Sequence, residues 1–282
     1  MKFVRFGNAG QEKPGLIDEA GRVRDLSAHI SDIDSTTLGS RAWNALRHVD
    51  ADTLPDAGPA QDTRFGPCVV GMNKIVCVGL NEKTHAKQMG VGIHPEPAVF
   101  FKPLSSLNGP SDPIVYPKIG QRLDWEAELA IVVGETCKYV DPTEARSKMA
   151  GFCIINDVSD RYWQIERGMS QALAGKWFDT FAPLGPWLVT PDELEEPDSL
   201  SIRTWVNDKL MQDFSSADYI FNVDRVFAHC SQFFTLYPGD VIAMGSGPGN
   251  GGHWNQFLQP GDTIRISLTG LGEQKNLIVM EK

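Results

Sequence analysis

The sequence lacks long apolar runs, a secretory signal and dense basic segments. Nowhere do about eighteen apolar residues follow one another, the length that a membrane-spanning helix needs. The opening residues, Met1–Gly7, have no apolar core of the kind found in signal peptides. The 282 residues carry 26 basic and 36 acidic side chains, a formal charge of -10, which repels polyanions. We therefore expect a cytoplasmic protein that binds neither nucleic acid nor a membrane.

Cysteine is also scarce. The five cysteines are odd in number, scattered, and mostly flanked by apolar residues. This arrangement is not typical of a disulfide framework or a zinc site, so we expect reduced thiols in the core. The chain has no internal repeat, heptad pattern or low-complexity tract, and its 41% apolar content is that of an ordinary globular protein.

Short strand-like runs separated by Pro and Gly turns dominate the chain. Residues 1–70 are interpreted as a small β-rich module with a connector, and residues 71–282 as the main domain. Regular alternation of strands and helices is absent. We therefore predict an α+β fold dominated by mixed or antiparallel sheet.

A short helix is expected over residues 82–89. Asn81 can cap its beginning and Gly90 would end it, so that His85 lies in its middle. A histidine in such a helix is otherwise often a packed or solvated side chain. Two further helices are expected near residues 142–150 and 223–234.

Two glutamates one residue apart, Glu126 and Glu128, open a strand-like run that becomes wholly apolar by residue 129. Side chains alternate along a strand, so both carboxylates lie on one face. Two like charges entering a core repel each other and are costly to bury. Either the run is a solvated strand end with two surface acids, or a divalent cation neutralises the pair.

A third acid, Asp157, ends another apolar run, residues 151–156. Three carboxylates without paired His or Cys ligands favour Mg²⁺ or Mn²⁺ over zinc or copper. The polar residues Ser159, Arg161 and Gln164 follow directly and suit an anionic or carbonyl substrate. Ordinary turn polarity explains them equally well.

Several ordered motifs give a more specific indication. They are 78–81 with His85, 100–103, 124–129, 156–159, 175–181, 183–187 and 238–242. Together they resemble the catalytic domain of the fumarylacetoacetate hydrolase family from about residue 73 to the C-terminus. The opening segment, including residues 10–15, resembles the N-terminal module of bacterial members that act on 2,4-diketo sugar acids. Within the family the chain thus resembles the branch of bacterial acylpyruvases and 2,4-diketo-3-deoxy sugar acid hydrolases.

The resemblance implies a cofactor and a site. Glu126, Glu128 and Asp157 would bind one Mg²⁺ or Mn²⁺ ion per subunit, and Lys176 would contact the metal-bound substrate. A homodimer acting on a small-molecule 2-keto acid is also implied. Three further residues would line the substrate pocket or lie near it: Arg161, Gln164 and Lys102. A strand-end charge is the alternative for Lys102.

The implied reaction is cleavage of the C–C bond of an acylpyruvate-type 2,4-diketo acid to pyruvate and a carboxylic acid. His85 is the candidate base for the water that attacks C4, since its unperturbed pKa is near neutral. The family usually has a glutamate three residues after this histidine, whereas this chain has Gln88, which can hold one tautomer but supplies no charge. Glu82, on the same side of the helix, could partly substitute.

A second departure lies at residues 245–253. Ser246 keeps the hydroxyl of the usual threonine, but Gly247 replaces a proline, which predicts a looser loop. Residues 253–255 are expected to form a surface loop. Because hydrolysis alone needs activated water, the Gln88 departure leaves four alternatives open: an oxaloacetate-type decarboxylase, an isomerase, a hydratase, or a non-catalytic ligand-binding protein.

Overall fold

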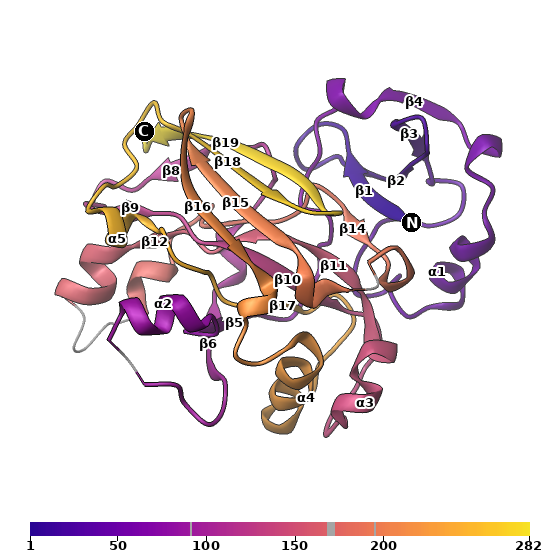
Figure 1. The fold of residues 1–282 in the computed structure, drawn as a ribbon. Helices are drawn as coiled ribbons and strands as arrows, with labels where there is room; N and C mark the ends of the chain where they lie inside the picture. Colours follow the sequence, from indigo (N-terminus) through magenta and orange to yellow (C-terminus); the bar gives the residue numbers. More distant parts are fainter. Residues whose placement is uncertain (91, 168–172, 195) are drawn as a thin grey trace.

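Two β-sheets form most of the molecule, one of ten strands and one of five (Figure 1). The computed structural model describes residues 1–282 with the exception of 91, 168–172 and 195. Helices are few and short beside the sheets. The prediction of an α+β fold dominated by mixed sheet is confirmed.

The ten-stranded sheet includes strands from the first 70 residues as well as from the rest of the chain. Its order is β4 (Asp56–Pro59), β3 (Arg22–Asp25), β2 (Lys13–Ile17), β1 (Lys2–Phe6), β14 (Leu188–Val189), β11 (Met149–Asn156), β10 (Ala127–Val133), β17 (Val241–Ala243), β5 (Ile75–Gly79) and β6 (Ala98–Lys102). Neighbouring strands are antiparallel except β17 and β5, which are parallel. Through the pairing of β1 with β14, strands β1–β4 continue the sheet that contains β10 and β11.

The remaining strands form one larger and two small sheets. The five-stranded sheet has the order β16 (Lys209–Ser215), β15 (Ser201–Val206), β18 (Thr263–Leu268), β19 (Gly272–Met280) and β8 (Ile114–Tyr116). The two-stranded sheets pair β12 (Ser159–Asp160) with β9 (Leu123–Asp124), and β13 (Ala182–Pro183) with β7 (Leu107–Asn108). Figure 1 shows β15, β16, β18 and β19 lying across β10 and β11.

The side chains of β10 alternate between two hydrophobic cores, as the period of a strand requires. Leu129 packs in the core shared with the five-stranded sheet, for example with Ile202. Ala130 packs on the other face, in the core that contains Trp43 of the N-terminal part. Glu128 therefore lies on the Ala130 face, at the end of a strand that is buried on both sides.

Five α-helices occur among the described residues: α1 (Arg41–Ala45), α2 (Lys83–Gln88), α3 (Pro142–Ala145), α4 (Val223–Phe233) and α5 (Gly251–Trp254). A π-helical turn spans Tyr162–Glu166. Short 3₁₀ turns span Leu46–His48, Ala51–Thr53, Ala60–Asp62, Leu104–Ser106, Arg146–Lys148, Ala174–Lys176, Pro191–Glu193, Pro197–Ser199 and Ser216–Asp218. None of these helices is long and apolar enough to cross a membrane.

The expected helices are present, with one correction. Those near 142–150 and 223–234 correspond to α3 with its following 3₁₀ turn, and to α4. The helix predicted over 82–89 is α2, but its cap is Glu82, whose carboxylate accepts hydrogen bonds from the first-turn N–H groups. Asn81 instead binds the backbone of two distant segments through its buried amide, contacts that are not evident from the local sequence.

Strands β11 and β14 approach each other so closely that only glycine fits at position 151. A Cβ added to Gly151 would lie 2.0 Å from the carbonyl oxygen of Val189. We expect Gly151→Ala to lower the free energy of unfolding by about 3 kcal/mol, because a backbone group must move to accept the methyl group. Urea denaturation measures the change. Gly92→Ala is the control, since an added Cβ there meets nothing within 4 Å; equal stability of the two variants would contradict the close contact.

Candidate active site

The three predicted acids come together where β10 and β11 meet. Ala127 pairs with Asn156 across the two strands, so Glu126 and Asp157, one residue further out, are neighbours. The N–H of Asp157 donates to the carbonyl of Glu126 at 2.9 Å. One carboxylate oxygen from each of Glu126, Glu128 and Asp157 lies within 4.8 Å of the others. Their exposed fractions are 8%, 1% and 0%, so the interpretation as surface acids is wrong.

Two lysines neutralise part of this acidic cluster. The Nζ of Lys176 donates to Glu126 Oε2 at 2.5 Å and to Asp157 Oδ2 at 2.7 Å. The Nζ of Lys102 lies 2.7 Å from Asp157 Oδ1 and donates to the carbonyl of Val158 at 3.0 Å. Both lysines are buried. Lys176 lines the adjacent cavity, whereas Lys102 lies behind Asp157 and is not among the lining residues.

Arg161 links the cluster to a fourth acid. Its Nε donates to Asp124 Oδ2 at 2.6 Å, one terminal nitrogen donates to Glu126 Oε1 at 2.5 Å, and the other donates to Gln164 Oε1 at 2.6 Å. Asp124 is fully buried and also accepts hydrogen bonds from the N–H groups at the start of α5. Asp124 was not predicted as a site residue from the sequence, although it stands only two residues before Glu126.

Burial and neighbouring charges shift the pKa values of these acids in opposite directions. Burial by itself raises the pKa of Glu126, but Lys176 and Arg161 outweigh burial and hold that pKa far below its usual range. Burial raises the pKa of Glu128 well above its usual range, and the charges of Asp157 and Glu126 add to the shift. Within the cluster, burial and the neighbouring negative charges thus destabilise the charged form of Glu128.

The donor set fits a hard divalent cation. Asp124 and the three clustered acids make four carboxylates against three cations, Lys102, Lys176 and Arg161. Glu128 forms no ion pair with a described residue and accepts one hydrogen bond, from the N–H of Gly245 at 2.7 Å. Three converging carboxylates without His or Cys are ligands of the kind that Mg²⁺ or Mn²⁺ prefers.

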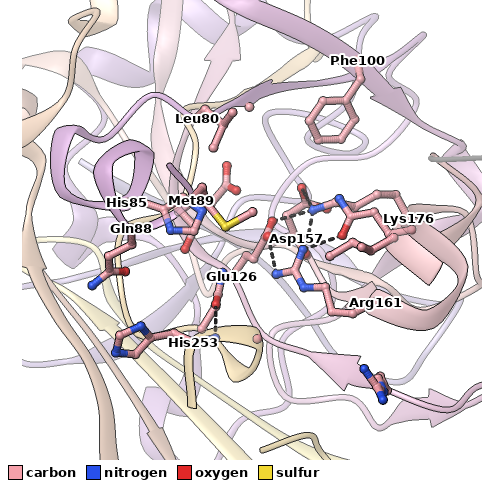
Figure 2. Close-up of a pocket in the computed structure, with 18 of the residues that line it drawn as sticks. Leu80, His85, Gln88, Met89, Phe100, Glu126, Asp157, Arg161, Lys176 and His253 are labelled. Atoms are coloured by element: carbon pink, nitrogen blue, oxygen red, sulfur yellow. Dashed lines mark hydrogen bonds and ion pairs between the residues drawn. The ribbon is translucent and has the colours of Figure 1, made fainter. Parts of the chain in front are cut away.

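The cluster opens into a cavity of about 810 Å³. Figure 2 shows Asp157, Lys176 and Arg161 on one side of the cavity, His85, Gln88 and His253 on the other, and Glu126 between them. Its lining residues come from segments far apart in the chain: 78–80, 85–89, Phe100, Arg122, 126–128, Asp157, 161–166, 173–176, Ser246, Asn250 and 252–257. Of the predicted site residues, Lys102, Ser159 and Glu82 lie outside this lining, and the hydroxyl of Ser159 instead donates to the carbonyl of Asp157 at 2.9 Å.

His85 faces the cavity from α2. Its Nδ1 is buried and has no hydrogen-bond partner among the described residues. Burial lowers the pKa of His85; the charge of Glu126 opposes this shift and that of Arg161 reinforces it. Glu82 does not reach the imidazole with a hydrogen bond, because its carboxylate caps the helix through the N–H groups of Thr84 and His85. Gln88 lines the cavity without a hydrogen bond to His85 in the described part of the chain.

The segment at 245–255 differs from its prediction. Ser246 lines the cavity as expected and accepts a hydrogen bond from Gln212 at 3.1 Å. The loop is not loose, because Gly247 is buried and a Cβ there would lie 2.4 Å from the ring of Phe214. Residues 253–255 are exposed as expected, but they form the end of the short helix α5 and its cap instead of a loop, and His253 lines the cavity.

Comparisons with known proteins identify relatives of the chain. The sequence profile of the family described as fumarylacetoacetate (FAA) hydrolase C-terminal matches residues 74–279. A protein of Burkholderia ambifaria, whose name states no activity beyond hydrolase, is 44% identical over 277 residues, 97% of each chain.

Two solved structures are similar over 100% of both chains. One is maleylpyruvate hydrolase from Sphingobium sp. SYK-6 in complex with manganese(II) ion and pyruvate, with a TM-score of 0.84 and 26% identity. The other is 5-carboxymethyl-2-hydroxymuconate delta-isomerase from Mycobacterium smegmatis, with a TM-score of 0.79 and 29% identity. The profile match and the 44% identical relative confirm the resemblance seen in the motifs: the chain belongs to the fumarylacetoacetate hydrolase family.

Proposed function

We propose that the protein is a Mg²⁺- or Mn²⁺-dependent hydrolase that cleaves the C–C bond of an acylpyruvate-type 2,4-diketo acid, giving pyruvate and a carboxylic acid. The observation that carries this proposal is the position of His85. Its imidazole lines the same cavity as the acidic cluster, and its buried Nδ1 has no described partner. The acids proposed to hold the cation and the imidazole proposed as the base thus line the same cavity (Figure 2).

The charge of the cluster suits an anionic substrate. A cation held by Glu126, Glu128 and Asp157 would supply Lewis-acid polarisation of the oxygens of a bound 2-keto acid. With a divalent ion, the four carboxylates and the three cationic side chains Lys102, Lys176 and Arg161 carry one net positive charge. The carboxylate of such a substrate balances this charge. The similar maleylpyruvate hydrolase from Sphingobium sp. SYK-6, whose structure contains manganese(II) and pyruvate, supports this proposal.

Lys176 and Arg161 would stabilise the pyruvate half of the substrate. Their ion pairs with buried carboxylates hold both cations in place, and both side chains line the cavity. Negative charge develops on this half as the C3–C4 bond breaks, and fixed cations in a buried site stabilise such charge strongly. The amide nitrogen of Gln164, whose oxygen accepts from Arg161, has no hydrogen-bond partner among the described residues and would be free to bind the substrate.

Hydrolysis consumes one water molecule. The water oxygen bonds to C4, which becomes the carbon of the carboxylic acid, and the electrons of the C3–C4 bond pass to C3, which takes a proton and becomes the methyl group of pyruvate. His85 would accept the proton of the attacking water. The lowered pKa keeps its imidazole neutral, and thus able to accept that proton, near pH 7.

An isomerase acting on a related unsaturated 2-keto acid is the second candidate. Such a reaction uses the same anion-binding groups and needs His85 only to move a proton between carbons. The similarity to a delta-isomerase and the uncharged Gln88 near His85 favour this alternative.

Isotopic labelling separates the two activities. We expect the protein with MgCl₂ or MnCl₂ to release pyruvate from acetylpyruvate, and the acetate formed in H₂¹⁸O to contain one ¹⁸O atom from solvent. Mass spectrometry of the products measures this. Turnover of an unsaturated 2-keto acid without pyruvate release would instead identify an isomerase.

Glu128→Gln tests the cation site. The change keeps the size of the side chain and removes one charged ligand, so we expect it to abolish the rise in melting temperature that MnCl₂ causes in the wild type. The metal-free melting temperature should not fall, because an unpaired buried carboxyl is lost. Differential scanning fluorimetry with EDTA and with MnCl₂ measures both effects. Glu135→Gln is the exposed control, and an unchanged MnCl₂ effect in Glu128→Gln would refute the assignment.

His85→Ala tests the base. We expect pyruvate release to fall by about 10² to 10⁴, while the MnCl₂ effect on melting temperature remains. In the wild type, kcat/KM should fall only as the pH drops below about 6.5, because the lowered pKa of His85 delays its protonation. The exposed His29→Ala is the control. Full activity of His85→Ala would remove the imidazole from the reaction.

A further inference from the structure

We propose that Gln212 is a positioning residue: its side-chain amide turns the hydroxyl hydrogen of Ser246 toward the cavity, where that hydrogen donates to an oxygen of the bound ligand. Gln212 lies on β16 behind the cavity, whereas Ser246 lines it. Both residues are buried, with exposed fractions of 1% and 6%. The inference rests on the proposed function, because it takes the acidic cluster as the end of the cavity that binds the acid group of the ligand.

The orientation of the Gln212 amide is fixed at both ends. Its Oε1 accepts from the N–H of Ala127 at 3.3 Å and from the hydroxyl of Thr204 at 2.8 Å. Its Nε2 donates to Ser246 Oγ at 3.1 Å and to the carbonyl of Gly247 at 3.2 Å. A backbone N–H only donates and a backbone carbonyl only accepts, so exchanging the amide oxygen and nitrogen would break bonds at both ends. The nitrogen therefore faces Ser246.

This contact decides what the Ser246 hydroxyl can do. A hydroxyl has one hydrogen to donate and accepts through its lone pairs. The bond from Gln212 occupies a lone pair of Ser246 Oγ, and the hydroxyl donates to no residue in the described part of the chain. Because Ser246 lines the cavity, its hydrogen is left for a ligand. The hydroxyl thus acts as a donor and matches a carboxylate or carbonyl oxygen, which only accepts.

Ser246 lies beside the acidic cluster. The N–H of the preceding residue, Gly245, donates to Glu128 at 2.7 Å, and Glu128 and Ser246 line the same cavity. The hydroxyl hydrogen is therefore directed to the end at which the proposed cation would hold the carboxylate and keto oxygens of a 2-keto acid. A donor that is already oriented stabilises negative charge on such oxygens without having to reorganise.

The loop that carries Ser246 packs directly against β16. A Cβ added to Gly249 would lie 2.2 Å from the carbonyl oxygen of Met211, a β16 residue. The carbonyl of Gly249 also accepts from the indole N–H groups of Trp125 and Trp254, at 3.1 Å each. These contacts hold the loop and the strand together, so the amide and the hydroxyl stay in register.

A double-mutant cycle tests the inference. Gln212→Met keeps the length of the side chain and removes the amide, and Ser246→Ala removes the hydroxyl. Isothermal titration of oxalate in MnCl₂ measures binding, since oxalate presents its oxygens as the acid end of a 2-keto acid does. We expect each single variant to bind oxalate about tenfold more weakly than the wild type, the size of one hydrogen bond to a charged group. The double variant should bind no more weakly than Ser246→Ala, because the amide acts through the hydroxyl.

Gln274→Met is the matched control. Gln274 is a buried amide on β19 that does not line the cavity. Its Nε2 donates to the carbonyls of Ile154, Pro183 and Gly185 at 3.0, 3.1 and 2.9 Å. We expect this variant to lower the melting temperature, as Gln212→Met does, but to leave oxalate binding unchanged.

Three results would overturn the inference. Additive losses in the double variant would show that Gln212 acts through Ala127 and β10 instead of through Ser246. Unchanged oxalate binding in Gln212→Met, or equally weakened binding in Gln274→Met, would remove its positioning role. Ser246→Ala loses only a hydroxyl and provides a test even if Gln212→Met does not fold: full oxalate affinity in Ser246→Ala would also refute the inference.

The proposed function is tested separately. A wild-type protein that does not bind oxalate in MnCl₂ would refute the anion site on which both proposals depend. Pyruvate release from acetylpyruvate tests the hydrolase alone. A non-additive cycle without pyruvate release would support the role of Gln212 and refute the hydrolase.

Discussion

The burial of Glu126, Glu128 and Asp157 within 4.8 Å of one another is the constraint on which the rest of the site depends. Three carboxylates removed from water repel one another, and each needs a partner to remain charged. Lys176, between two of them, is therefore buried as well. Glu128 has no such partner among the described residues, and a divalent cation would be a suitable partner, as proposed above.

The fold supplies these groups from separate segments. The register of β10 against β11 sets Glu126 beside Asp157. The segment that follows β17 contains Gly245, whose N–H donates to Glu128. Asp124 extends the network by binding both Arg161 and the start of α5. Asp124 thus connects α5, in the far wall of the cavity, to the acidic cluster through Arg161. A shift of α5 is therefore expected to disturb the cluster.

The sequence predicted the centre of the site better than its walls. Strand periodicity, a short-range pattern, placed Glu126 and Glu128 on one face. Ligand chemistry and the family resemblance joined the distant Asp157 to them. The mixed sheet followed from the absence of regular βαβ spacing. The cap of α2 and the place of His253 were missed, since they depend on contacts between residues far apart in the chain. The tight packing of Gly247 against Phe214 is of the same kind.

We propose that the three acids hold the cation at which a 2-keto acid binds. Anomalous scattering at the manganese edge, from crystals grown with MnCl₂ and oxalate, tests it most directly. We expect one manganese peak per chain, within coordination distance of Glu126, Glu128 and Asp157, with oxalate on the side of the cavity that Lys176 lines. A manganese peak elsewhere, or acids that contact only Lys176 and Arg161, would contradict it.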